Sequence, residues 1–467
     1  MRLDSRYWVP LAVALGLALR LYHFLLCPVV WHDEAAMIVN VLNLTFPEML
    51  GPLVHAQAAP PLFLMLERVV VLLFGDSEYA LRLIPFLASC GSVVVVAGLA
   101  QRVTTTGTAA VAVGLFAVSE RLLWHSTEAK PYSVDVFVAA LVAYGFVRTI
   151  DWPLWTRCRL GIVLAPVMIW LSFPACFVLG AVLVGLLPSW WAERRNWSAW
   201  LGYSGFASAV MLAFMALALG PAVAQRSAEL DSFWREDFPD VAHPLSVVPW
   251  ALLRTLEVIR YAIRPHGFLF AGNIVIAAVV WCRRGKVTTV VVLLLPIGLA
   301  LIAALLGKYP YGGTRLLAYA APAVCLLTAE GLRIVIDASG RLRSLAWGFA
   351  ALCLVIPVGL AGYTVIAPWP RAACDEAAAY VLQHREANDC ILINHWEYEY
   401  YFRHHPQHWR TWYGTFTPDD LARHRIWVLH TAEPVPESFP FVLPKGWHVA
   451  DSSKYFQTVV YRLERDE

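Results

Sequence analysis

The sequence predicts a polytopic α-helical membrane protein with about 11 transmembrane helices, juxtamembrane helices and a small C-terminal α/β domain. Its 467 residues are 59% hydrophobic and 15% charged, with a mean hydropathy of +0.58, whereas soluble domains carry roughly 25% charged residues. Long apolar runs recur through residues 1–366, while residues 367–467 have a soluble composition. The net charge of +2 gives no indication of a nucleic-acid partner, and none is expected.

The first span is expected at residues 8–26, and the apolar run at 60–74 is too short to be the second. At 1.5 Å per residue this run reaches about 22 Å, whereas the hydrocarbon core is about 30 Å thick. The run also contains Glu67 and Arg68. We therefore expect an interfacial helix lying on the membrane. The later spans are expected at residues 81–101, 108–123, 133–149, 160–171, 174–188, 200–219, 268–281, 287–306, 316–332 and 345–366, although the stretch 160–188 could also form one span.

The distribution of basic residues predicts the orientation of the chain. If residues 60–74 do not span, nearly every basic cluster between helices falls on one side of the membrane; if they do span, every later cluster moves outside. Positive charge is retained on the cytoplasmic side, so we expect a cytoplasmic N-terminus and an extracytoplasmic C-terminal domain. The clusters are Arg102; Arg148, Arg157 and Arg159; Arg194 and Arg195; Arg283, Arg284 and Lys286; Arg333, Arg341 and Arg343.

The C-terminal domain, residues 367–467, is expected to alternate a helix with short strands. Residues 375–385 have helical periodicity, and residues 390–394, 426–430 and 457–463 have the composition of strands. The chain has nine cysteines, and no pair has a metal-type CxxC spacing. Cys374 and Cys390 would open the helix and the following strand, about 15–20 Å apart. This separation is too large for a disulfide, so both are expected to be free thiols.

Acidic residues in two outer segments are the candidate catalytic groups. Asp33 and Glu34 follow the first span, and Glu128 lies in the turn before the span at 133–149. A carboxylate in a partly desolvated pocket can act as a general base; it can also bind a divalent metal. The alternative is ordinary charge at the end of a span, or a loop salt bridge for Glu128.

Basic and polar residues of the same expected face could bind a phosphate and line a cleft. Lys308 and Arg315 bracket a glycine-containing turn at a helix start, which suits an anion. Lys130 could pair with Glu128 or face the same phosphate. The alternative is that these cations snorkel at the interface. The further cleft candidates are His55, Gln57, Tyr132 and Arg82.

The tail segment 395–405 is rich in histidine and aromatic residues. Its spacing matches no zinc pattern, so stacking on a sugar or plain packing is the favoured interpretation. We expect no metal and no other cofactor.

Six short motifs occur along the chain, and their order and spacing carry a family resemblance. In these motifs the chain resembles the GT-C superfamily of membrane glycosyltransferases, in particular bacterial proteins similar to protein O-mannosyltransferases and to the lipid A aminoarabinose transferase (family 39-like). The resemblance covers about the first 150 residues by motif and the rest by architecture. The motifs are Asp33-Glu34; Pro60-Pro61-Leu62-Phe63; Phe74-Gly75-Asp76-Ser77-Glu78; Leu81-Arg82-Leu83; Ser126-Thr127-Glu128-Ala129-Lys130-Pro131-Tyr132; and Arg315 before Pro322.

The resemblance implies an inverting glycosyltransferase in the bacterial inner membrane. In such enzymes the first outer loop holds the catalytic aspartate, which falls on Asp33, and the second acid falls on Glu128. The donor is a polyprenyl-phosphate sugar, and the acceptor is a lipid, glycan or protein on the extracytoplasmic face. Lys130 stands where many relatives have arginine, and no basic residue precedes Pro60-Pro61. The alternatives are a non-catalytic lipid or glycolipid transporter and a membrane scaffold.

Overall fold

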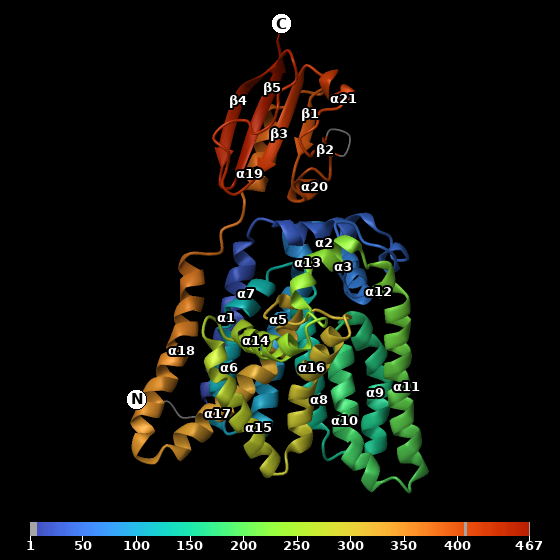
Figure 1. Ribbon diagram of the computed structural model, residues 1–467, viewed down its shortest axis with the longest axis vertical. Helices are drawn as coiled ribbons and strands as arrows, with labels where there is room; N and C mark the ends of the chain where they lie inside the picture. The colour runs from blue at the N-terminus through green and yellow to red at the C-terminus, as the bar shows by residue number, and fades with distance from the viewer. Residues whose placement is uncertain (1–6, 406–408, 467) are drawn as a thin grey trace. The chain divides into compact units, whose positions relative to one another are not determined.

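The computed structural model describes residues 7–405 and 409–466, which separate into two compact units (Figure 1). Unit 1 contains residues up to Leu26 and the segment Leu44–Pro368, and unit 2 contains Cys27–Asn43 and Trp369–Glu467. The expected boundary at residues 366/367 lies close to the second of these junctions. The structure differs from the expected division in one respect, because the segment after the first span packs with the C-terminal domain.

Unit 1 is built of helices throughout its described part. The helices up to residue 219 are α1 (Trp8–Leu26), η2 (Glu48–Leu50), α3 (Pro61–Phe74), α4 (Glu78–Leu81), α5 (Leu83–Val103), α6 (Thr106–Ala117), α7 (Glu120–His125), α8 (Tyr132–Arg148), α9 (Leu154–Leu171), α10 (Ala175–Ala192) and α11 (Trp197–Leu219). The remaining ones are α12 (Pro221–Ala224), α13 (Ala228–Phe233), η3 (Arg235–Asp237), α14 (Pro244–Ala262), η4 (Gly267–Phe270), α15 (Ala271–Arg283), α16 (Val287–Leu305), η5 (Arg315–Ala320), α17 (Ala321–Ala338), η6 (Gly340–Leu342) and α18 (Arg343–Ile366).

Among the described residues, eight helices are long and apolar enough to cross a membrane, or nine if one bent pair counts as a single span. They correspond to eight of the expected spans, and the stretch 160–188 forms two of them, α9 and α10. The three other expected spans are the shorter helices α6, α8 and α15. The expected helix at 60–74 is confirmed as α3, where Pro61 occupies the first helical position, a place that proline favours.

Two regions of unit 1 differ from the expectation. The expected span 108–123 ends at Ala117, and a separate short helix, α7, follows. At this break Ser119 Oγ donates to the carbonyl of Ala262 at 2.8 Å, which satisfies a carbonyl at the end of α14. Between the expected spans 200–219 and 268–281 lies the 19-residue helix α14, which meets the segment Gly267–Arg283 at 107°.

One charged side chain inside the helix bundle forms hydrogen bonds within its own helix and to two neighbouring helices. Arg20 in α1 is buried; its Nε donates to Ser89 Oγ at 2.7 Å, and its Nη1 donates to the carbonyls of Gly16 and Ala117 at 3.0 and 3.2 Å. A buried guanidinium needs such partners. Arg20 therefore ties α1 to α5 and α6.

Unit 2 is an α/β structure whose sheet has the strand order β2-β1-β3-β5-β4. Strand β1 pairs in parallel with β2 and β3, while β5 pairs antiparallel with β3 and β4. The strands are β1 (Cys390–Ile393), β2 (Trp409–Thr411), β3 (Arg425–Thr431), β4 (Trp447–Tyr455) and β5 (Thr458–Arg465). The helices of this unit are α2 (His32–Asn43), α19 (Cys374–His384), α20 (Glu397–Tyr401) and α21 (Pro418–Leu421).

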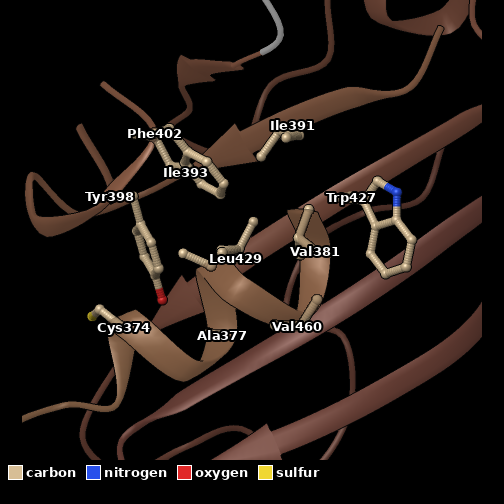
Figure 2. Packing of buried hydrophobic residues seen from close by; sticks show 11 residues of the cluster. Cys374, Ala377, Val381, Ile391, Ile393, Tyr398, Phe402, Trp427, Leu429 and Val460 are labelled. Carbon is tan, nitrogen blue, oxygen red and sulfur yellow. The ribbon is translucent and has the colours of Figure 1, made fainter. Parts of the chain in front are cut away.

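Helix α19 packs on one face of this sheet, as Figure 2 shows. Ala377 and Val381 of α19 lie against Ile391, Leu429 and other buried side chains of the strands. Side chains alternate between the two faces of a strand, and the alternate positions, such as Leu392 and Val428, form a second buried cluster, so both faces of the central strands are apolar. The expected helix and three expected strands are confirmed as α19, β1, β3 and β5. All nine cysteines are free, which confirms the two free thiols expected at Cys374 and Cys390.

Candidate functional site

The candidate residues from the sequence are divided between the two units. Asp33 and Glu34 belong to unit 2, and the other candidates belong to unit 1. The cleft that all of them were expected to share therefore stays a prediction, and each group is described within its own unit.

The turn between α7 and α8 forms the centre of the unit 1 group. His125 ends α7, Tyr132 begins α8, and every residue from His125 to Tyr132 is buried. Ser126 Oγ donates to the carbonyl of Leu123 at 2.6 Å, and Ser133 Oγ donates to the carbonyl of His125 at 2.8 Å. These side-chain bonds satisfy the carbonyls at the end of α7 and hold the turn in one conformation.

Glu128 is the first link of a buried polar chain. Its Oε2 lies 2.8 Å from His125 Nδ1, and His125 Nε2 lies 2.7 Å from the hydroxyl of Tyr261 in α14. Glu128 Oε1 is also buried, and it has no hydrogen-bond partner among the described residues. A carboxylate held in this way orients the imidazole. Its second oxygen can accept a bond from a bound molecule.

Lys130 and Gln57 form a second polar contact in unit 1. Lys130 is buried, and its Nζ donates to Gln57 Oε1 at 2.6 Å. Gln57 Nε2 in turn donates to the carbonyl of His55 at 3.0 Å. The structure thus brings together three of the sequence candidates, and it places a buried ammonium beside the segment that leads into α3.

Arg315 is surrounded by aromatic rings. Its guanidinium carbon lies 5.7 Å from the ring centroid of Tyr132, 5.9 Å from that of Phe233 and 5.5 Å from that of Trp234. These distances are within the range of cation–π attraction. Arg315 is half-buried. The rings therefore hold the guanidinium of Arg315 in position.

The two remaining cations, Lys308 and Arg82, differ in burial and in their ion-pair partners. Lys308 is exposed, and in residues 7–405 and 409–466 its side chain forms no ion pair. Arg82 is buried, and its Nη1 lies 3.7 Å from Glu78 Oε2 one helical turn away. Arg82 therefore has an ion-pair partner within its own segment.

In unit 2, Asp33 and Glu34 have different surroundings. Asp33 is half-buried at the start of α2, whereas Glu34 is fully buried. Glu34 Oε2 lies 3.2 Å from Arg371 Nη1, which also donates to the carbonyl of Val29 at 2.7 Å. Because Arg371 lies 337 positions from Glu34, sequence spacing gave no signal for this pair. The contact attaches α2 to the segment before α19.

The residue before Asp33 belongs to a third cluster, also in unit 2. His32 Nδ1 lies 3.2 Å from Glu397 Oε2, and His395 Nδ1 lies 3.3 Å from the same oxygen. Burial opposes the ionisation of Glu397, but the hydrogen bonds from His32 and His395 outweigh it and lower its pKa to about 2. Among the described residues, these three side chains form the one group with the geometry to hold a metal ion.

Sequence reasoning found only some of these residues. It identified Glu128, Lys130, Gln57 and Arg315, but it missed His125, Tyr261 and Arg371. His125 stands three residues before Glu128, a spacing at which residues of a helical turn meet, so a local signal existed for it. Tyr261 lies 136 positions from His125, and no local pattern indicates it.

No protein-family model matches the sequence, and no curated protein matches it either. Solved structures do match. The structure of ArnT from Cupriavidus metallidurans has a TM-score of 0.54 at 13% identity, over 98% of both chains, and so does the structure of that protein bound to undecaprenyl phosphate. The Archaeoglobus fulgidus oligosaccharyltransferase in complex with Zn and sulfate has a TM-score of 0.53 at 16% identity, over 85% of this chain.

The coverage differs between these matches. The present chain spans 61% of the length of the archaeal oligosaccharyltransferase, so that likeness concerns only part of the larger protein. The likeness to ArnT extends over nearly the whole of both chains, including their C-terminal regions. The expected architecture of membrane helices followed by a small α/β domain is thereby confirmed, and the chain shares the fold of these solved structures.

Proposed function

We propose that this protein is an inverting glycosyltransferase that moves a sugar from a polyprenyl-phosphate donor to an acceptor on the extracytoplasmic face of a bacterial inner membrane. The main support is the likeness to ArnT over 98% of both chains, together with the solved complex of that protein with undecaprenyl phosphate. The buried acidic and basic groups of unit 1 support the same proposal, because such groups are rare inside membrane proteins and mark functional sites.

Asp33 is the proposed general base. Its carboxylate takes the proton from the acceptor hydroxyl as that oxygen attacks the anomeric carbon. The new carbon–oxygen bond forms on one face of the sugar while the bond to the phosphate oxygen breaks on the other. The electron pair leaves with the polyprenyl phosphate, so the anomeric configuration inverts.

The departing phosphate requires positive charge, and Lys130 and Arg315 are proposed to supply it. Lys130 is buried with its ammonium on Gln57, and Arg315 is held among aromatic rings. Neighbouring side chains hold both cations in place, which lowers the cost of organising the site. Lys308 is exposed and is proposed to attract the phosphate at longer range.

The two other acids are proposed to position groups. Glu34 is committed to Arg371, so it holds the helix on which Asp33 lies. Glu128 orients His125, and its unpartnered Oε1 is available to a hydroxyl of the sugar or acceptor. The partners are thus the lipid-linked donor, membrane lipid and a lipid, glycan or protein acceptor.

A transfer assay tests the proposal. Purified protein in liposomes is given radiolabelled polyprenyl-phosphate sugars with a panel of lipid, glycan and peptide acceptors. We expect transfer with at least one pair and its loss in Asp33→Asn. Asp419→Asn is the matched control, because it makes the same chemical change at an exposed position of unit 2.

The outcomes separate the alternatives. Full activity in Asp33→Asn would contradict the assignment of the base. Movement of the lipid across the liposome without consumption of the sugar donor would indicate a transporter. A protein that neither binds nor consumes the donor, but whose biological effect is lost when the chain is truncated after Pro368, would be a scaffold.

A further inference from the structure

The strongest feature outside the proposed transfer site is the cluster of His32, His395 and Glu397. His32 is the first residue of α2, His395 lies between β1 and α20, and Glu397 is the first residue of α20. In the sequence, 365 positions separate His32 from Glu397. Their ligand atoms all lie within 4.8 Å of one another. In the described part of the chain, no other three histidine, cysteine or acidic side chains bring such atoms this close.

The distances in the cluster match those between ligands of a metal ion. In a tetrahedral site with bonds of about 2.0–2.1 Å, neighbouring ligand atoms are about 3.3–3.4 Å apart. The two imidazole nitrogens lie 3.2 and 3.3 Å from the same carboxylate oxygen.

The surrounding residues hold the three side chains in place. Trp396 stacks on the ring of His32, with centroids 4.1 Å apart and planes 11° apart. Asn394, next to His395, exchanges two 2.9 Å hydrogen bonds with the backbone of Thr431 in β3. Supporting contacts of this kind fix the direction of metal ligands, and here they anchor the cluster to the sheet.

The three side chains differ in exposure, with the carboxylate buried and the two imidazoles partly open to solvent. The side chain of Glu397 is 4% exposed, whereas those of His395 and His32 are 29% and 41% exposed. The carboxylate is thus a buried anion that a cation would neutralise, and the imidazole side is open for entry of the ion and for a water molecule as fourth ligand. Two nitrogens and one oxygen favour a borderline transition metal over magnesium or calcium.

We propose that His32, His395 and Glu397 bind one divalent transition-metal ion of the zinc class, with water as the fourth ligand. The ion joins the start of α2 to the C-terminal sheet domain within unit 2. Because the ion would bind the folded unit and not the unfolded chain, it stabilises this arrangement by mass action. The proposal does not depend on glycosyl transfer, since it concerns only the folding of this unit.

Cobalt and zinc titrations of the full chain test the proposal. The protein is purified in detergent without a histidine tag and stripped of metal with a chelator. We expect wild type to bind one Co²⁺ with visible ligand-field absorption, and Zn²⁺ to displace it. Replacing a direct ligand, in His395→Ala or Glu397→Gln, should weaken binding by more than the roughly 10–100-fold that outer partners contribute.

His448→Ala is the matched control. His448 also lies 2.8 Å from a carboxylate, that of Asp466, but it is exposed and belongs to no group of three ligands. This variant should bind Co²⁺ as wild type does. Equal loss of binding in His448→Ala would show that the metal is held adventitiously and would overturn the proposal.

Thermal unfolding guards against variants that merely misfold. Zinc should raise the unfolding temperature of unit 2 in wild type and in His448→Ala, but not in His395→Ala or Glu397→Gln. Metal-free wild type and the two ligand variants should each give a cooperative transition. The absence of stoichiometric binding by wild type at micromolar metal, or an unchanged zinc effect in both ligand variants, would refute the site.

Discussion

Replacement of Arg371 by methionine should loosen the helix that carries Asp33. The side chains of Arg371 and Glu34 are 3% and 0% exposed, and their charged atoms lie 3.2 Å apart. Removing one partner of such a pair leaves the other charge buried, which costs about 3–5 kcal/mol. The lost bond to the carbonyl of Val29 overlaps with this cost, so it is not added.

The free energy lost with this ion pair should increase the rate of hydrogen exchange at the amides of α2. At 1.4 kcal/mol for each factor of ten, about 3–5 kcal/mol corresponds to an increase of about 100-fold to 4,000-fold in local opening. Hydrogen–deuterium exchange of the full chain in detergent should therefore show that Arg371→Met lowers the protection of amides in α2. The double variant Glu34→Gln with Arg371→Met should recover part of it, because no buried charge is left unpaired.

An exposed pair of similar geometry provides the control. Arg226 Nε lies 3.0 Å from Asp231 Oδ1, but both side chains are about half exposed, so Asp231→Asn should cost only about 0–1 kcal/mol. If Arg371→Met left the exchange of α2 amides as in wild type, the buried pair would not be what holds this helix. Strict additivity of the two single variants would contradict the coupling.

Three further predictions concern other parts of the chain. A methyl group on Gly331 would clash with the backbone carbonyl of Asn273 in α15. Gly331→Ala should therefore destabilise the fold by about 1–3 kcal/mol through overpacking and lower the thermal unfolding temperature, while Gly348→Ala, with open space around it, should not. Burial raises the pKa of Asp420, but hydrogen bonds, chiefly from Arg410, outweigh it and leave the pKa below its usual value of 3.8. This contribution to stability is present above about pH 4 and is lost as the pH falls further, so Asp420→Asn should be destabilised at pH 6 and lose this acid dependence in unfolding scans. Tyr261→Phe removes a hydroxyl bonded to an imidazole, so it should lower the transfer rate with normal folding; an unchanged pH–rate profile would contradict a role for that hydroxyl.

The sequence predicted those helices and strands in which apolar residues form a run or recur at a regular spacing. The strands β1, β3 and β5 have mostly buried side chains, and the expected segments fall on them. Strand β4 was missed because its sequence Trp447–Tyr455 is mainly polar and half-exposed at the sheet edge. Strand β2 has only three residues, too few to show a period. Helix α14 was missed because charged residues interrupt it.

The sequence predicted the site residues only where charged side chains lie close together in the chain. Glu128 and Lys130 share one turn, and their charges stand out in an apolar segment. The partners Tyr261 and Arg371 come from distant segments, and only folding brings them together with His125 and Glu34. His395 and Glu397 lie in the tail segment 395–405 that the sequence singles out, but their contact with His32 has no local signal, because 365 positions separate His32 from Glu397.

The most direct test of the proposed transferase is the location of the donor phosphate in a structure of the full protein with a polyprenyl phosphate. The account predicts density for the phosphate within hydrogen-bond distance of Lys130 Nζ or the Arg315 guanidinium. With a sugar attached, Asp33 should face the anomeric carbon on the side opposite the phosphate. A phosphate bound away from both cations, or an Asp33 carboxylate that cannot reach the sugar, would contradict the account.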